Sequence, residues 1–301
     1  MASHPLRPVL GVRGPLLGGP VLLARCWWLV PLALLVVAPF QLASWSLTCH
    51  LGSCAESLTL VELLGVPGSL LGSVAAHVYR GALSAPPLLL ITAAATAGLT
   101  AASARTPIGI RTALREIAAR ARPLGALIAF SAALPVISLL APVALWRLLF
   151  GPLADNLRPD GLRPIAIGVL LVVLLFGALA AMTAAIVALV ATVPVVLEGC
   201  SAVRAFRRTL SLAVKRVLPT FGTVLLVLVA SEFVAAAMDV LWRTADLTAL
   251  PAWLGAALNA TLGDAVSLPL TAAMYFVRYV DLRARDGFQR ADLVRAAPGP
   301  R

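Results

Sequence analysis

Two carboxylates inside long apolar segments are the side chains of this chain best placed to do chemistry. Glu232 lies in TFGTVLLVLVASEFVAAAMDV and Asp264 in ALNATLGDAVSLPL, with Asn259 nearby. An acid within a lipid bilayer is costly unless it faces a bundle interior, a partner or water, so such residues are functional candidates by default. Because both acids fall at a similar depth on consecutive segments, we expect them to approach each other or to share Asn259 or Arg243. The alternative is a hydrated position at the outer interface.

The cysteine and histidine residues are a second and weaker candidate for a functional site, either a metal site or a disulfide. His50 lies between Cys49 and Cys54, but this spacing alone does not supply the four ligands that zinc requires. We favour a disulfide between Cys49 and Cys54 in an oxidising outer compartment, and two free thiols are the alternative. No GxSxG, P-loop, HExxH or dinucleotide motif occurs in the chain. The sequence therefore predicts no catalytic residue, no metal and no cofactor.

The elements that must position these residues are six long apolar segments. Hydrophobic residues make up 60% of the chain and charged residues 12%, and the mean hydropathy is +0.96. A membrane-spanning helix needs about 20 apolar residues. The sequence therefore predicts an all-α polytopic membrane protein, with one membrane domain over 27–282 between a lead-in at 1–26 and a tail at 283–301. The expected transmembrane helices cover residues 27–46, 86–104, 124–145, 165–190, 217–240 and 256–277.

The distribution of basic residues predicts an orientation. Lys and Arg concentrate in the short loops on the cytoplasmic side of a membrane protein. Most of the 24 basic residues fall in the lead-in, in two alternate gaps and in the tail, which puts both termini in the cytoplasm. The net charge of +11 comes from these regions, and no nucleic-acid-binding motif accompanies it. Anionic lipid headgroups are therefore the expected partner, with no nucleic acid.

The two basic cytoplasmic gaps, 105–123 and 198–216, share one pattern. In each, apolar residues recur at helical spacing, and the other positions are basic, as in a helix that lies in the membrane interface. Each gap ends at a proline that opens the following span, Pro123 or Pro219. A duplicated two-span unit is one explanation, and the general basicity of cytoplasmic loops is the other. The side chains expected to contact headgroups are Arg111, Arg115, Arg204, Arg207, Arg208, Lys215 and Arg216.

Two other topologies remain open. Residues 1–45 resemble a signal peptide in having basic residues before an apolar run, but the run is long and no clean cleavage site follows it. The outer loop at 47–85 is partly apolar, and Glu56, Glu62 and Pro67 interrupt it too early for a span. We expect one or two short helices on the outer surface there, because a seventh span would place the basic N-terminus outside.

Two stretches carry a resemblance to a known family. They are VPVVLEGCSAVRAFRRTLSLAVKRVLP and SLPLTAAMYFVRYVDLRARDGF. Together with residues 99–122, they resemble the membrane domain found fused to some glycerophosphoryl diester phosphodiesterases, and related stand-alone six-span bacterial membrane proteins. The resemblance covers about residues 86–288. The phosphodiesterase domain, with its His and acidic metal ligands, is absent, so the resemblance does not imply that activity.

The resemblance and the composition together lead to two hypotheses of function. The first is a non-catalytic module of the bacterial cytoplasmic membrane that supports envelope or lipid-linked processes through lipid contact or by docking a membrane-protein partner. It rests on the resemblance, since a fold alone does not define a function. The second is a small transporter with a polar path near Glu232, Asn259 and Asp264. A single Lys against many Arg residues is typical of a GC-rich bacterial genome.

Overall fold

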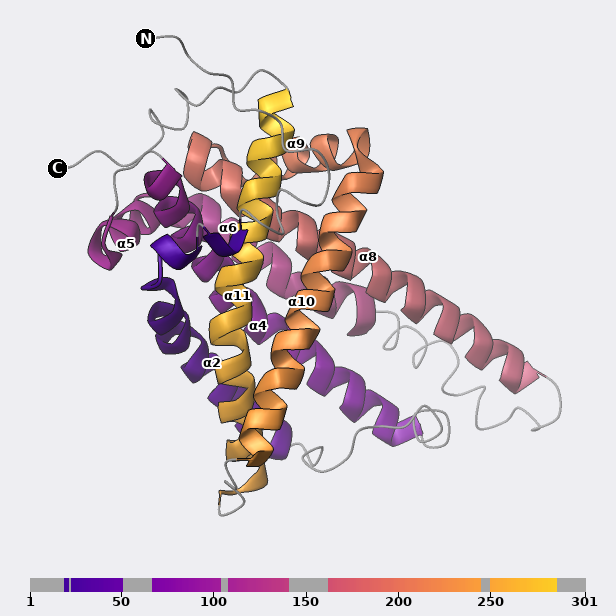
Figure 1. Ribbon diagram of the computed structural model, residues 1–301. Helices are drawn as coiled ribbons and strands as arrows, with labels where there is room; N and C mark the ends of the chain where they lie inside the picture. The colour runs from indigo at the N-terminus through magenta and orange to yellow at the C-terminus, as the bar shows by residue number, and fades with distance from the viewer. Residues whose placement is uncertain are drawn as a thin grey trace, which may run out of the picture.

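The predicted all-α membrane fold is confirmed. The structure, a computed structural model, describes residues 19–21, 23–50, 67–103, 108–140, 162–244 and 250–285, and this part of the chain contains helices and no strand (Figure 1). The helices are α2 (Leu29–His50), α4 (Pro67–Ser103), α5 (Ile110–Ala119), α6 (Ala121–Pro135), the π-helix η1 (Val136–Leu140), α8 (Leu162–Glu198), α9 (Ala202–Lys215), α10 (Val217–Thr244) and α11 (Ala252–Arg285).

Six of the helices in the described residues are long and apolar enough to cross a membrane, judged by length and composition. They are α2, α4, α6, α8, α10 and α11, and successive ones alternate in direction along the bundle (Figure 1). The short helices α5 and α9 precede α6 and α10 at one end, where α11 also finishes. We call this end the basic end, because it carries the arginines of α5, α9 and the last turns of α11.

The interior of the bundle is built around α4 and α11. Every described position from 91 to 102 on α4 is buried, and small residues there let the neighbouring helices approach closely. The hydroxyls of Thr92, Thr96 and Thr100 each donate to the carbonyl four residues earlier, at 2.8, 2.7 and 2.6 Å. Their polar groups are thus satisfied within α4 itself. This threonine stripe is structural, as its spacing indicates.

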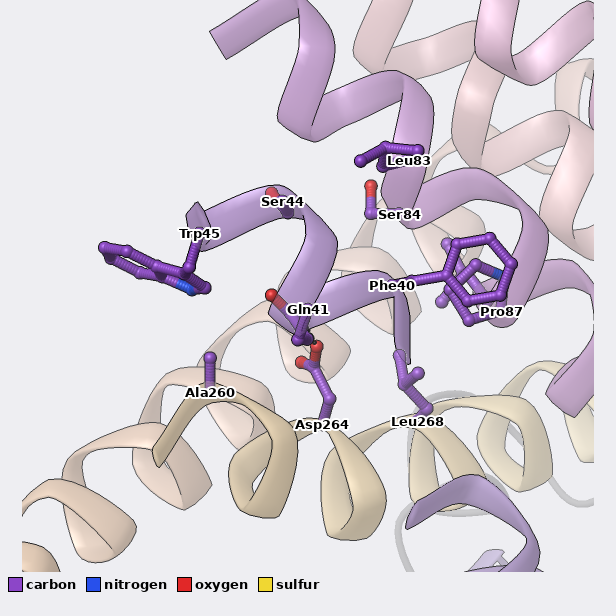
Figure 2. Close-up of a pocket in the computed structure, with 11 residues that line it drawn as sticks. Phe40, Gln41, Ser44, Trp45, Leu83, Ser84, Pro87, Ala260, Asp264 and Leu268 are labelled. Carbon is purple, nitrogen blue, oxygen red and sulfur yellow. Dashed lines mark hydrogen bonds between the residues drawn. The ribbon is translucent and has the colours of Figure 1, made fainter. Parts of the chain in front are cut away.

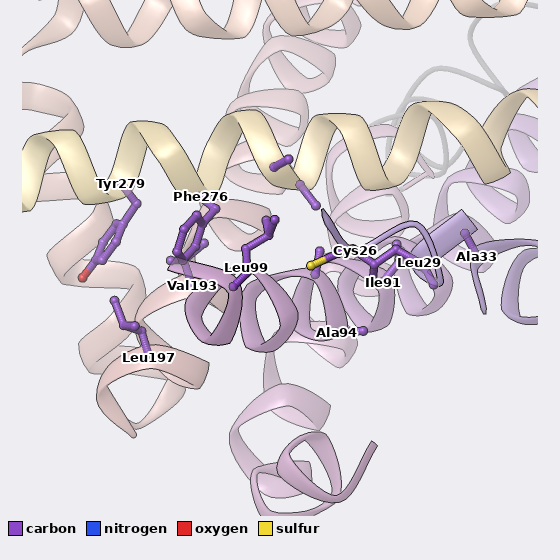
Figure 3. Packing of buried hydrophobic residues seen from close by; sticks show 14 of the residues in the cluster. Cys26, Leu29, Ala33, Ile91, Ala94, Leu99, Val193, Leu197, Phe276 and Tyr279 are labelled. Carbon is purple, nitrogen blue, oxygen red and sulfur yellow. The ribbon is translucent and has the colours of Figure 1, made fainter. Parts of the chain in front are cut away.

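Large side chains from α11 complete the core. Phe276 and Tyr279 point toward Val193 and Leu197 of α8 (Figure 3). Close approach elsewhere depends on Gly98 of α4, because a Cβ atom there would lie 2.9 Å from the ring of Trp28. By contrast, α10 packs mainly against α11, and most of its surface is exposed. Exposed apolar side chains of α10 and of residues 172–182 of α8 are suited to contact acyl chains.

The helix boundaries differ from the sequence prediction in two places. Residues 67–85, predicted to belong to an outer loop with short helices, instead form the first half of α4, which continues through Pro86 and Pro87. The second span was expected to begin at Pro86, but the helix accommodates Pro86 and Pro87 in its interior. The fourth span, expected to cover residues 165–190, extends further as α8, which continues through Pro194 to Glu198 and stops at Gly199. Residues 51–66 of the predicted loop lie outside the described residues.

The two basic segments have the same backbone arrangement. One arginine separates α5 from α6, and one separates α9 from α10, at Arg120 and Arg216. In both junctions the arginine N–H donates to the carbonyl three residues earlier, and its own carbonyl accepts from the N–H four residues later. A proline follows each arginine by three positions, in the first turn of the next helix, where its missing N–H costs nothing. The repeated sequence pattern therefore corresponds to a repeated structure.

Candidate functional site

Asp264 lies in a polar contact between α11 and α2. Its Oδ2 accepts a hydrogen bond of 2.5 Å from Nε2 of Gln41. Figure 2 shows the two side chains pointing toward each other across the space between the helices. A buried carboxylate with a hydrogen-bond donor avoids most of the penalty that an unpaired one would incur. The hydrogen bond from Gln41 therefore lowers the free-energy cost of placing the Asp264 carboxylate at this position.

A cavity of about 470 Å³ lies beside this contact. It is bounded by α2, α4 and α11 at the end of the bundle opposite the basic end. Leu83 and Ser84 of α4 face it in Figure 2, whereas the ring of Trp45 points away from Asp264. The volume is within the range of small-molecule pockets, and the walls are mainly apolar with a few polar groups. The lining residues are Phe40, Gln41, Ser44, Trp45, Leu83, Ser84, Pro87, Leu88, Ala260, Asp264 and Leu268.

The structure gives the two intramembrane acids different surroundings. Asp264 pairs with Gln41, and Glu232 is exposed on α10. Arg243 pairs with Asp239 of its own helix at 2.8 Å and so is not the shared partner of the two acids. Asn259 is half-buried on α11, and its Oδ1 has no hydrogen-bond partner among the described residues. Similar depth therefore does not by itself bring two side chains together, since depth does not determine the direction in which a side chain points.

At the basic end, Glu198 is the centre of a cluster of polar contacts. Its Oε1 accepts from the Tyr279 hydroxyl at 2.8 Å and from Nε of Arg283 at 3.2 Å. Its Oε2 accepts from Arg208 of α9 and, at 3.7 Å, from the Cys200 thiol. One carboxylate thus joins α8, α9 and α11. Burial raises the pKa of the Cys200 thiol, and the nearby Glu198 carboxylate raises it further.

A second buried ion pair lies on the same part of α11, between residues that are close to Tyr279 and Arg283 in the sequence. Nη1 of Arg278 donates to Oδ2 of Asp281 at 3.0 Å, and Nη2 of Arg285 lies 3.4 Å from the same oxygen. The side chains of Arg278 and Asp281 are only 4% and 5% exposed. A buried arginine in a membrane protein is costly unless its donors are satisfied. The Nε and Nη2 atoms of Arg278, however, have no partner among the described residues.

The surface of α9 is divided into three faces. Ala205, Thr209 and Leu212 are buried against the bundle. Val203, Leu210 and Val214, which the sequence places on the apolar face, are 64%, 42% and 64% exposed. The third face carries basic side chains, and Arg216 directly follows the helix. Arg208 on this face pairs with Glu198. The other basic side chains are exposed: Arg204, Arg207, Lys215 and Arg216. Three of the four residues of the predicted apolar face thus point outward, whereas the fourth, Phe206, packs edge-on against Phe130 of α6 with ring centroids 5.3 Å apart.

The helix α5 repeats this division on a smaller scale. Ala113 is buried, Ile110 and Leu114 are exposed, and Arg111 and Arg115 are exposed on the next face round the helix. The buried, apolar and basic faces follow one another in the same rotational order as on α9, about 100° per residue. Figure 1 shows α9 crossing the end of the bundle where α8 finishes and α10 begins. Both helices therefore offer an apolar face and a basic face side by side.

Sequence reasoning missed the residues that organise the basic end. Glu198, Tyr279 and Arg283 were noted only as parts of two motifs, and Gln41 was not singled out. The available signals were an isolated Gln within an apolar span and the repetition of charged residues near the end of the last span. Cys49 and His50 lie in the last turn of α2, whereas Cys54 lies outside the described residues, so the Cys49–Cys54 disulfide stays a prediction. Within the described residues, no group of three His, Cys, Asp or Glu residues could hold a metal ion.

Comparisons with protein-family models, with curated proteins and with solved structures find no match to this chain.

Proposed function

We propose that this chain is a non-catalytic module of the bacterial cytoplasmic membrane that supports envelope or lipid-linked processes by contacting anionic lipid headgroups through α5 and α9. In this proposal the basic end and both termini are cytoplasmic. The observation that carries it is the outward-facing apolar side of α9, flanked by exposed cations. A helix of this kind lies in the membrane interface, with its apolar face at the acyl boundary.

The charge on these faces supports an anionic partner. Arg204, Arg207, Lys215 and Arg216 pair with no carboxylate among the described residues, and the same holds for Arg111 and Arg115 on α5. Near an anionic membrane surface, each basic residue contributes about 1 kcal/mol of attraction. Because the two helices start separate spans, they anchor two parts of the bundle to one leaflet. A membrane-protein partner with an acidic surface would use the same cations.

Spin labels along α9 test the placement of its faces. We expect labels at Val203, Leu210 and Val214 to be accessible to oxygen, which concentrates in the acyl region, in vesicles that contain phosphatidylglycerol. A label at Ser211 should instead be accessible to a water-soluble nickel chelate, and it is the matched control because it adjoins Leu210 on the basic side. Equal nickel accessibility at Leu210 and Ser211 would contradict the proposed interfacial position.

Lipid analysis tests the headgroup contact itself. Replacement of Arg204, Arg207, Lys215 and Arg216 by Gln should lower the ratio of anionic to zwitterionic lipid that copurifies with the protein. Arg243→Gln, an exposed arginine at the opposite end of the bundle, is the control and should leave the ratio unchanged. An unchanged ratio in the four-site variant would exclude these cations as the lipid contact.

A small transporter is the second candidate, and the cavity beside Asp264 favours it. A carboxylate at an apolar cavity suits a solute with an apolar body and a cationic or hydrogen-bond-donating group. Proteoliposomes with the chain should then take up a lipophilic cation such as tetraphenylphosphonium faster than empty ones, and Asp264→Asn should abolish the difference. Equal uptake by wild type and empty vesicles would count against transport of this solute class.

A further inference from the structure

The charged side chains of α10 lie on the side of this helix that faces away from the bundle. Successive residues of an α-helix are about 100° apart, so Asp239 and Arg243 lie within about 20° of Glu232. Thr223 and Val227, on the opposite side, are buried, whereas only 6% of the spanning window of α10 is buried overall. The helix packs mainly against α11 (Figure 1). We call the outward side the Glu232 face, which carries Leu225, Glu232, Ala235, Ala236, Asp239 and Arg243.

The carboxyl group of Glu232 lies at the depth of the acyl chains. Glu232 is midway along the spanning window Thr220–Thr244, about 18 Å from either end at 1.5 Å per residue, and the hydrocarbon core of a bilayer is about 30 Å thick. Its side chain is exposed and forms no hydrogen bond or ion pair among the described residues. Ionisable side chains inside a membrane almost always face a bundle interior, water or a polar partner. Acyl chains suit the exposed Phe233 and Leu241 on the flanks of α10, but they do not suit the Glu232 face.

The charges of the Glu232 face are complementary to themselves. Two copies of the chain in one membrane have the same orientation, so a two-fold axis normal to the membrane sets their α10 helices parallel and brings residues of equal depth together. Glu232 then meets Glu232 of the second copy, and two carboxyl groups can hydrogen-bond through a shared proton. Arg243 of each copy, whose side chain is 78% exposed, lies about one turn from Asp239 of the other, at a depth that allows an ion pair across the interface.

Small side chains on the Glu232 face allow two helices to approach. Ala235 and Ala236 lie on the turn that follows Glu232, and both are exposed. Small residues let two backbones in a membrane come close enough for van der Waals packing and for interhelical hydrogen bonds. One polar residue within an apolar helical seam also fixes the register of the pair, at a cost in stability. The Glu232 face thus has the properties of a helix–helix interface, and a face covered by lipid needs none of them.

We propose that the Glu232 face is the interface between two copies of this chain, formed by a parallel pair of α10 helices and joined by their Glu232 carboxyl groups. The interface lies on a different helix from the cations that contact lipid headgroups in the proposed function. It therefore does not rest on that function, and the two proposals can fail independently.

Neighbouring alanines give a matched test of this interface. In a background of Cys49→Ser and Cys54→Ser, Ala236→Cys lies on the Glu232 face and Ala237→Cys lies about 100° away, and both positions are exposed. Mild oxidation of membranes that contain the full chain should convert the Ala236→Cys variant to a disulfide-linked species of twice the mass. The Ala237→Cys variant should stay largely monomeric. Equal cross-linking of the two variants, no cross-linking of either, or an adduct of the Ala236→Cys variant with a different protein would overturn the proposal.

Variants of Glu232 test the carboxyl group itself. Fluorophores at Ala118→Cys on α5, in the same background, report association by energy transfer in vesicles of phosphatidylcholine and phosphatidylglycerol as the protein is diluted in lipid. Glu232→Leu should weaken association about 10-fold because the interhelical hydrogen bond is lost, whereas Glu232→Gln can still hydrogen-bond and should retain it. Phe233→Leu, on the flank of α10, is the control and should leave association unchanged.

Thermal unfolding in detergent separates a loss of association from a loss of folding. Glu232 has no polar partner within its own bundle, so the Glu232→Leu variant should unfold at the wild-type temperature or above it. A folded Glu232→Leu variant that associates as tightly as wild type would overturn the role of the carboxyl groups. A wild-type chain that shows no energy transfer at any dilution would overturn the interface and leave lipid and water as what covers this face.

Discussion

The Tyr279 hydroxyl donates to Oε1 of Glu198 at 2.8 Å, across 81 positions of the chain. Glu198 ends α8, and Tyr279 lies in the last third of α11, so this bond connects the stretch at 193–219 with the last part of α11. Arg208 of the first stretch and Arg283 of the second bind the same carboxylate. The two stretches therefore form one structural unit, with Glu198 as the acceptor that three helices share.

Removing the charge of Glu198 should destabilise the protein. Glu198→Gln keeps the shape but leaves Arg208 and Arg283 without their anion, in a site where Glu198 is only 13% exposed. We expect a loss of about 2–3 kcal/mol in the free energy of unfolding. Thermal or denaturant unfolding in detergent measures it. Glu116→Gln is the control, because Glu116 is 27% exposed and pairs with one arginine of its own helix region four residues on, an arrangement that contributes about 0.3–0.5 kcal/mol. Equal losses of unfolding free energy in the two variants would show that Glu198 contributes no more to stability than Glu116 does.

The turn after Glu198 requires glycine. Gly199 has φ +65°, a conformation that costs other L-residues about 1–2 kcal/mol, and nothing lies within 4 Å of a Cβ atom built there. Gly199→Ala should therefore destabilise the protein by that amount through the backbone alone. Gly125→Ala should have the opposite sign, with a gain of about 0.5–1 kcal/mol, because Gly125 is an exposed position within α6 with open space around it. If both variants change the free energy of unfolding in the same direction, the backbone conformation does not explain the effect at Gly199.

The contact between Gln41 and Asp264 should appear as an energetic coupling. Gln41→Leu leaves a half-buried carboxylate without its donor and should cost about 1–3 kcal/mol. Asp264→Leu removes the carboxylate, so adding Gln41→Leu to it should cost less than Gln41→Leu does alone. A double-mutant cycle by thermal unfolding then gives a coupling of about 0.5–3 kcal/mol. Strictly additive effects would indicate that the two side chains do not interact in the membrane.

The sequence was sufficient for the helices and insufficient for the contacts between side chains. Apolar length predicts each span, and the spacing of Leu210 and Val214 predicts an apolar face on α9. Neither property tells which face contacts the bundle, because small residues such as Ala205 can pack as closely as large ones. The partner of Asp264 was missed for a related reason. Gln41 is 223 positions away, and only the packing of α2 on α11 brings the two residues together.

The thiols of Cys26 and Cys200 should react slowly. Both are buried, and burial raises the pKa of each thiol above its usual value of 9.0. The protonated thiol is a poor nucleophile, so a maleimide should modify neither at neutral pH in the folded protein. Because each thiol has a higher pKa in the folded protein than in the unfolded chain, the stabilisation linked to its protonated form is complete below pH 9.0. This stabilisation declines as the pH rises further. Rapid labelling of Cys200 at neutral pH would contradict the buried position.

The proposed orientation can be tested with new cysteines at exposed positions. Ala118→Cys and Ser211→Cys lie on the basic end, and Thr244→Cys lies at the far end of α10. Cys49→Ser and Cys54→Ser provide a background in which the remaining native thiols are buried. If the basic end is cytoplasmic, as the proposed function has it, an impermeant maleimide added to intact cells should label only the Thr244→Cys variant. Permeabilised cells should be labelled at all three positions. Labelling of the Ser211→Cys variant in intact cells would reverse the orientation and remove the cytoplasmic leaflet as the partner of α9.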